Sequence, residues 1–215
     1  MNQKVFTQAC HSKKHLVYMN DKKTLEPVLG DSVAKEVQQN VKTHEVPPAS
    51  LRTVTDLRKF IKSLNRSEIP SDYRIAVGGF ILDQNNQLVL IERGALARDS
   101  IGKLEGIGGG VDDNEEDLHS ALLREIGEEI GLSGKQVKII TPLTVKTLPG
   151  KTTGGYWVVP IYVCKIQEGE PYISGSGEVK AIKRFSLDHL PEENVSEYEK
   201  VTMQAYLERK TQGSL

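Results

Sequence analysis

The sequence lacks the features of several protein classes. Its 215 residues include no apolar run near the roughly 20 residues that span a bilayer. The N-terminus has no apolar segment of a secretory signal, which favours a soluble, cytoplasmic protein. The two cysteines, Cys10 and Cys164, lie far apart and match no metal or redox spacing, so we expect free thiols. The five histidines fall at no ligand spacing either, and we assign them no site.

The charge is unevenly distributed along the chain. The net charge of -1 conceals +4 over residues 1–72 and -5 over the remainder. The basic residues of the first segment are not clustered with aromatic residues, so a solvated surface is favoured over a nucleic-acid contact. Residues 105–132 contain nine acidic residues and one basic residue, Arg124. Because a run of charge is usually only a solvated face, the positions of these acids must decide their role.

The composition of the chain and its helix-breaking prolines predict one main domain with an appendage. The sequence is 38% apolar and 27% charged, which is enough to build a core. Residues 15–29 favour a hairpin and residues 31–41 a short helix. After Pro47 and Pro48, apolar residues recur at helical spacing over 54–64, and we expect that helix to dock on the main domain. We assign 1–72 as an N-terminal α+β extension that completes a homodimer or covers a cleft, and 73–215 as the main domain.

The main domain is predicted to hold a mixed sheet between helices. Residues 74–83 and 87–93 are apolar strands around an Asn-containing turn. Further strands are expected at 136–140, 156–166 and 179–187, and helices at 118–130 and 196–210. Since strands alternate with only two helices and no regular βαβ repeat, the fold class is α/β without a doubly wound sheet.

The segment "REIGEEIGL" places three glutamates on one border of the helix at 118–130. With Asp117 as N-cap, the apolar residues of this helix fall within about 100° of arc, and the glutamates occupy the neighbouring arc. The three are Glu125, Glu128 and Glu129. They repel one another at i,i+3 and i,i+4 spacing, and they lie at the helix end where the dipole disfavours anions. A divalent cation bound by their oxygens would offset both costs.

Four glycines precede this helix, at Gly106, Gly108, Gly109 and Gly110. They permit a tight turn and a close backbone approach, so that a main-chain carbonyl or amide can reach a metal or a phosphate. Alone, such a run is more often a plain turn, but next to a carboxylate cluster the binding role is favoured. The segment is neither a Walker loop nor an EF-hand, because it lacks the residues that each of these motifs requires.

These residues together resemble a known family motif. From Gly110 the chain has five residues, Glu116, seven residues and then Arg124 to Leu132, which resembles the complete Nudix box of the Nudix hydrolase family. A looser similarity runs from about residue 74 to about residue 190. The chain departs from the family at Leu104 and Ile107, where many members have Trp and Pro, and at Arg184-Phe185, where the later aromatic is shifted. These departures bear on the loop geometry and leave the acidic positions intact.

The resemblance implies an α/β/α sandwich around a mixed sheet. It also implies Mg²⁺- or Mn²⁺-dependent hydrolysis of a nucleoside diphosphate linked to another moiety, in which water attacks a phosphorus. By position, the resemblance implies that the metal ligands are Glu125, Glu128, Glu129 and the Gly110 carbonyl. Glu116 would be an accessory ligand. Arg124 would orient the glutamates by ion pairing.

Weaker candidates lie outside the box. Glu178 falls where many relatives carry a glutamate that assists catalysis, and the plain alternative is a solvated loop residue. Arg93 can meet a phosphate as a bidentate donor or be a solvated strand-end arginine, and Gly109 is a further substrate-binding candidate. Tyr156 and Trp157 fall on opposite faces of one strand; one can stack on a base, although core packing is the favoured role.

Substrate identity is left open by the sequence. ADP-ribose, a sugar nucleotide, a nucleoside triphosphate and a non-nucleotide diphosphate all fit the motif. We expect the loop at 146–155 and the N-terminal segment to select among them. A different class of function is a Nudix-fold sensor that binds a nucleotide without cleaving it and regulates a partner, and the intact box argues against it.

Overall fold

The computed structural model describes residues 42–43, 46–64, 72–112, 114, 116–149, 155–175 and 177–215. The hairpin predicted at 15–29, the helix predicted at 31–41 and Cys10 lie outside them.

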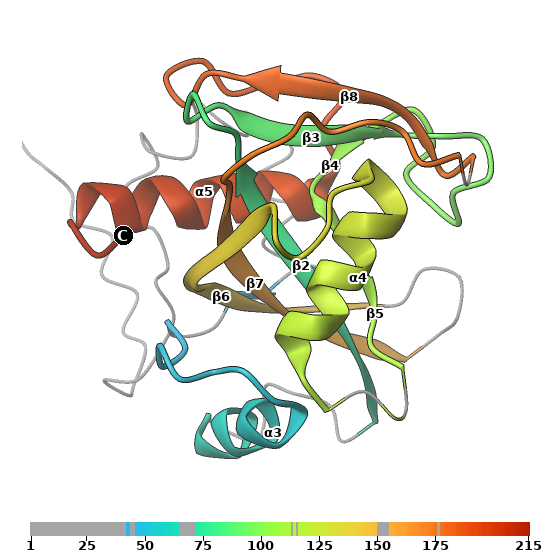
Figure 1. The fold of residues 1–215 in the computed structure, drawn as a ribbon. Helices are drawn as coiled ribbons and strands as arrows, with labels where there is room; N and C mark the ends of the chain where they lie inside the picture. Colours follow the sequence, from blue (N-terminus) through green and yellow to red (C-terminus); the bar gives the residue numbers. More distant parts are fainter. Residues whose placement is uncertain are drawn as a thin grey trace, which may run out of the picture.

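A mixed sheet lies between helices, as predicted for an α/β/α sandwich (Figure 1). Its elements are β1 (Lys42–Thr43), α3 (Val54–Ser63), β2 (Tyr73–Leu82), β3 (Leu88–Arg93), β4 (Leu104–Glu105), β5 (Ile107–Gly110), α4 (Leu118–Ile130), β6 (Val137–Pro149), β7 (Tyr156–Ile166), β8 (Val179–Phe185) and α5 (Glu197–Thr211).

The sheet combines parallel and antiparallel pairing. Its path runs β1-β6-β7-β2-β3-β4, while β5 pairs with β2 and β8 pairs with β3. The pairing of β2 with β7 is parallel, and the remaining strand pairs are antiparallel. The central strand β2 therefore has β5 and β7 beside it, and this places the glycine-rich residues of β5 in the middle of the molecule.

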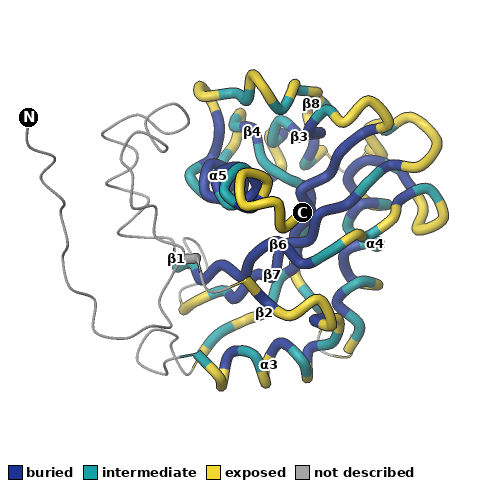
Figure 2. Tube along the Cα trace, turned by 90° about the vertical axis from the view of Figure 1, so that its left-hand side faces the viewer, coloured by how far each residue is buried: buried dark blue, intermediate teal, exposed yellow. Residues whose placement is uncertain are grey.

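Side-chain alternation along the strands builds a core on each face of the sheet. In β2, Val77 and Ile81 pack in the cluster that includes α4, whereas Phe80 and Leu82 pack in the cluster that includes α5. This follows from the two-residue period of a strand. Both faces are covered by helices, so β2, β3 and β7 are buried over most of their length (Figure 2).

Helix α3 packs into the same core as α4. Thr53 caps it, with its hydroxyl accepting from the Asp56 N–H and the Asp56 carboxylate accepting from the Thr53 N–H. Leu57 and Ile61 are buried in the cluster with α4, so the helix docks as expected. Its residues precede position 72, and the division into 1–72 and 73–215 stays a prediction.

Helix α4 spans the predicted residues 118–130. Asp117 caps it by accepting from the N–H groups of His119 and Ser120, and Gly131 ends it in the left-handed conformation with φ 69°. In the part of the chain that the structure covers, no helix is long and apolar enough to cross a membrane.

Two predictions about loops were wrong. Residues 107–110 form the strand β5 and not a tight turn, because they pair with β2 over Ala76–Gly79. A Cβ on Gly108 would lie 2.2 Å from the Val77 carbonyl oxygen, so only glycine fits this pairing. The strand predicted at 136–140 continues to Pro149 and pairs with β7 as far as Tyr156, so Lys146 lies in a strand and not in the expected loop.

Leu57→Ala tests whether α3 is part of the same cooperative unit as the sheet. Because Leu57 is fully buried, we expect the free energy of unfolding to fall by about 2–5 kcal/mol, in a single transition measured by chemical denaturation. Lys59→Ala on the exposed face of the same helix should change it by less than about 0.5 kcal/mol. Separate unfolding of α3, without a change in the main transition, would contradict the shared core.

Candidate functional site

The three glutamates of α4 differ in their exposure. The side chains of Glu125 and Glu129 are 13% and 6% exposed, whereas that of Glu128 is 58% exposed. Helix α4 packs on β5 and β2, which brings the first two carboxylates beneath the glycine strand. The site therefore has a buried part at Glu129 and an open part at Glu128.

Glu125 and its neighbours meet around one guanidinium group. Arg124 Nη1 donates to Glu125 Oε1 at 2.7 Å and approaches Glu128 Oε2 at 3.4 Å, and Arg124 Nη2 donates to the Gly110 carbonyl at 2.8 Å. A Cβ on Gly109 would lie 2.4 Å from the Glu125 carboxyl carbon, so a larger residue here would displace this carboxylate. Three of the predicted oxygen ligands thus converge on a single positive charge.

This convergence bears on whether a divalent cation fits. Carboxylate and carbonyl oxygens are the donors that Mg²⁺ and Mn²⁺ prefer. In this structure these oxygens surround the positively charged guanidinium group of Arg124. In the described ranges, no three Asp, Glu, His or Cys side chains form a group that could hold a metal ion. The residue types fit a hard cation, and a bound ion would compete with Arg124 for the same oxygens.

Glu129 is buried and has two partners. Burial raises the pKa of its carboxyl to about 8. Glu129 Oε2 accepts from the Gly108 N–H at 3.1 Å, and Oε1 accepts from Arg93 Nη1 at 3.3 Å. Arg93 also pairs with Glu105, at 3.5 Å between Nε and Oε2, and is itself 13% exposed. Arg93 is therefore not the solvated strand-end residue that was its alternative.

Glu116 lies apart from the other glutamates, at the start of α3. Its Oε1 accepts from the Thr55 N–H at 2.9 Å, and its carbonyl accepts from the Val54 N–H. Next to it, Arg52 pairs with Asp117 at 2.9 Å. A cavity of about 350 Å³ separates α3 from the sheet here and is lined by Glu116 and Gly110 among others. Residues before position 72 thus hold the segment that leads into α4.

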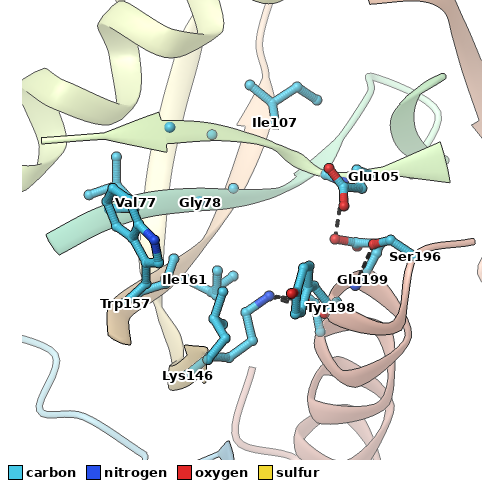
Figure 3. A pocket seen from close by; sticks show the side chains of 18 of the residues that line it. Val77, Gly78, Glu105, Ile107, Lys146, Trp157, Ile161, Ser196, Tyr198 and Glu199 are labelled. Carbon is cyan, nitrogen blue, oxygen red and sulfur yellow. Dashed lines mark hydrogen bonds between the residues drawn. The ribbon is translucent and has the colours of Figure 1, made fainter. Parts of the chain in front are cut away.

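A second cavity lies on the face of the sheet toward α5 (Figure 3). It measures about 240 Å³, and β5 lies between it and the glutamates of α4. Gly109 and Arg93 line it, and Arg93 reaches from it to Glu129. A ligand in this cavity would therefore lie close to the glutamate site.

The remaining predicted residues are placed as follows. Tyr156 is 42% exposed and lines neither cavity, whereas Trp157 lines both, so Trp157 is the better placed to stack on a ligand. The Glu178 carbonyl accepts from the Gly94 N–H, which places this residue next to the end of β3. Cys164 is a buried free thiol.

Sequence reasoning missed the polar groups at the α5 end of the cavity. Glu105, Lys146 and Glu199 line it; Lys146 and Glu199 are buried, and Glu105 is half-buried. The three residues come from β4, β6 and α5, and their separation in sequence gave no local pattern. The only available signal was a charged residue inside an otherwise apolar segment.

Comparison with known proteins gives the following matches. A family model described as NUDIX domain matches residues 72–205. The structure of a MutT NUDIX hydrolase from Burkholderia pseudomallei has a TM-score of 0.52 and 26% identity, and the alignment covers 63% of this chain and 98% of that chain. The MutT protein from Methanosarcina mazei Go1 has a TM-score of 0.52 and 20% identity, covering 66% and 97%. The NUDIX domain of Shewanella oneidensis NrtR, complexed with ADP ribose, has a TM-score of 0.50 and 14% identity, covering 71% and 97%. No match is found among curated proteins.

Gly109→Ala should displace the Glu125 carboxylate. The added Cβ would lie 2.4 Å from the carboxyl carbon, so we expect the free energy of unfolding to fall by about 1–3 kcal/mol. At Gly110 a Cβ would meet nothing within 4 Å, so Gly110→Ala should leave stability within about 0.5 kcal/mol of the wild type. Equal effects of the two changes on chemical denaturation would refute this packing.

Glu129→Gln should stabilise the metal-free protein at alkaline pH. Burial raises the folded-state pKa of Glu129 to about 8 from its ordinary value of 4.5, so its contribution to stability is full below pH 4.5 and is lost as the pH rises to 8. Gln carries no proton to lose, so the midpoint of thermal unfolding should be equal at pH 4 and several degrees higher for the variant at pH 9. A variant less stable than the wild type at pH 9 would contradict the burial of this carboxyl.

Proposed function

Because the chain belongs to the NUDIX family of hydrolases, we propose that it cleaves the diphosphate bond of a nucleoside diphosphate linked to another moiety, with Mg²⁺ or Mn²⁺ bound. The observation that carries this proposal is the convergence of the Gly110 carbonyl, Glu125 and Glu128 on one positive charge. Glu129 lies beneath the same strand, held by the Gly108 N–H. This grouping of oxygens supports the proposal of a cation site.

The residues of the Nudix box have different proposed roles in holding the metal. The Gly110 carbonyl with Glu125, Glu128 and Glu129 would hold the metal, which when bound neutralises phosphate charge and lowers the pKa of water. Glu116 accepts from the Thr55 N–H, so its proposed role is an accessory one. Arg124 holds Glu125 in place, as its 2.7 Å contact indicates.

Arg93 and Glu178, which lie outside the Nudix box, are proposed to bind the substrate and to activate the attacking water. Arg93 has a buried guanidinium next to Glu129, and it would donate to a phosphate oxygen of the substrate. Glu178, beside the end of β3, is the proposed base that accepts a proton from the attacking water. The water oxygen bonds to phosphorus, the bond from phosphorus to the bridging oxygen breaks, and that oxygen leaves with the other phosphate.

The proposed substrate classes are ADP-ribose, a sugar nucleotide and a nucleoside triphosphate. The ADP-ribose complex of the NrtR domain, at 14% identity, makes ADP-ribose a reasonable first probe. A nucleotide sensor that does not cleave its ligand would not require all the box glutamates. The two functions separate when product release is compared with binding in the same buffer.

Glu128→Gln and Glu129→Gln should each lower turnover by roughly 100-fold or more with Mg²⁺ present, because each removes a charged oxygen from the site. Product release from a panel of nucleotides is the measurement, and circular dichroism checks the fold. Glu192→Gln, an exposed glutamate outside both cavities, is the matched control. Near-normal turnover in both variants would refute the proposed metal site.

A further inference from the structure

The cavity on the α5 side of the sheet is lined by residues with buried polar atoms that lack a hydrogen-bond partner among the described residues. Three buried side-chain atoms of residues that line it have no hydrogen-bond partner: Glu105 Oε1, Glu199 Oε1 and Arg93 Nε, the last of which lies 3.5 Å from Glu105 Oε2 in an ion pair. In the part of the chain that the structure covers, the other such atoms belong only to Gln204 and Arg209. Buried polar atoms are nearly always paired, so unpaired atoms gathered in one cavity indicate a missing partner.

Glu199 is the most enclosed of these groups. Its side chain belongs to the first turn of α5, and the residue is 5% exposed. Its Oε2 accepts from the Gly106 N–H at 3.0 Å, which leaves Oε1 as the orphaned acceptor. A Cβ on Gly106 would lie 2.7 Å from Oε2, so the glycine at this position makes room for the carboxylate.

Lys146 supplies the donor at the same end of the cavity. Its Nζ donates to the Tyr198 carbonyl at 3.1 Å and to Thr202 Oγ1 at 2.7 Å. An ammonium group has three N–H donors, so one more is available to a ligand. The polar end of the cavity thus offers one spare donor and two carboxylate acceptors, from Glu105 and Glu199.

The opposite end of the cavity is apolar. Figure 3 shows Val77, Trp157 and Ile161 at a distance from the group formed by Glu105 and Glu199. The volume of about 240 Å³ is below the roughly 300–1,000 Å³ of pockets that enclose a whole drug-sized ligand. It suits one part of a ligand, namely a flat ring with apolar faces and a polar edge, and a nucleobase has this form.

We propose that this cavity binds a guanine base, with its two neighbouring N–H donors directed at Glu105 Oε1 and Glu199 Oε1 and its carbonyl directed at Lys146. Among the four common bases, only guanine has a carbonyl acceptor followed by a ring N–H and an amino group on one edge. This inference rests on the proposed function for the rest of the ligand, because β5 separates the cavity from the glutamate site and a diphosphate would extend toward Arg93.

The ionisation of the two carboxyl groups depends on opposing effects. Burial raises the pKa of Glu105, raises that of Glu199 to about 8 and lowers that of Lys146, so burial by itself favours the neutral forms. The positive charges of Lys146 and Arg93 and the N-terminal turn of α5 act in the opposite direction. N–H donors from a bound ligand would stabilise the ionised carboxylates that accept them.

The first test varies the ligand and needs no mutation. Binding of guanosine, inosine and adenosine 5′-monophosphates to the full chain is measured by calorimetry with EDTA, so that neither metal nor cleavage is involved. Inosine lacks the amino group and should bind on the order of 10-fold more weakly than guanosine, and adenosine on the order of 100-fold more weakly. Equal affinity for the three nucleotides would overturn the proposal.

The second test changes the carboxylate. Glu199→Gln can keep the contact with the Gly106 N–H through its carbonyl while presenting an amide N–H in place of the acceptor. We expect it to lose the preference for guanosine over adenosine, a change on the order of 10- to 100-fold. Glu197→Gln, on the same helix but paired with Lys103 outside the cavity, should keep the preference. A preserved preference in Glu199→Gln would also overturn the proposal.

Hydrolysis is measured separately, as product release with Mg²⁺. Selective guanosine binding without any release from a nucleotide panel would refute the proposed function and leave the base site standing. Release with no preference among bases, in binding or in cleavage, would refute the base site and leave the proposed function standing.

Discussion

The close approach of helix α4 to the glycine strand β5 is the constraint on which the rest of the site depends. A Cβ on Gly109 would meet the Glu125 carboxylate and a Cβ on Gly108 would meet the Val77 carbonyl, while the Gly108 N–H donates to Glu129. Just before this strand, Gly106 makes room for Glu199. Residues 106–110 therefore form the wall shared by the carboxylates of α4 and the cavity under α5.

This packing makes the site electrostatically costly. Glu129 is buried with a raised pKa, and it is balanced only by Arg93 and one backbone N–H. Buried charges are costly unless paired, so the arrangement works against stability in the absence of a cation. We propose that the same cost would give the site affinity for a divalent ion, since a cation would relieve a repulsion that the fold has already imposed.

Local patterns in the sequence predicted the parts of the fold that local chemistry determines. Helix α4 was placed correctly because Asp117, an apolar stripe and Gly131 define its start, face and end. Strand β5 was not predicted, because glycine carries no strand propensity and its pairing with β2 depends on residues some 30 positions away. Lys146 and Glu199 were missed for a related reason, since β6 and α5 meet only in the folded chain.

The oxygens around Arg124 are proposed to form a cation site. Titration of the protein with Mn²⁺, followed by electron paramagnetic resonance, measures this without a substrate. We expect loss of the free-ion signal with the wild type, and retention of that signal with a variant that carries both Glu125→Gln and Glu128→Gln. Equal uptake of Mn²⁺ by the two proteins, or no uptake by the wild type, would contradict it.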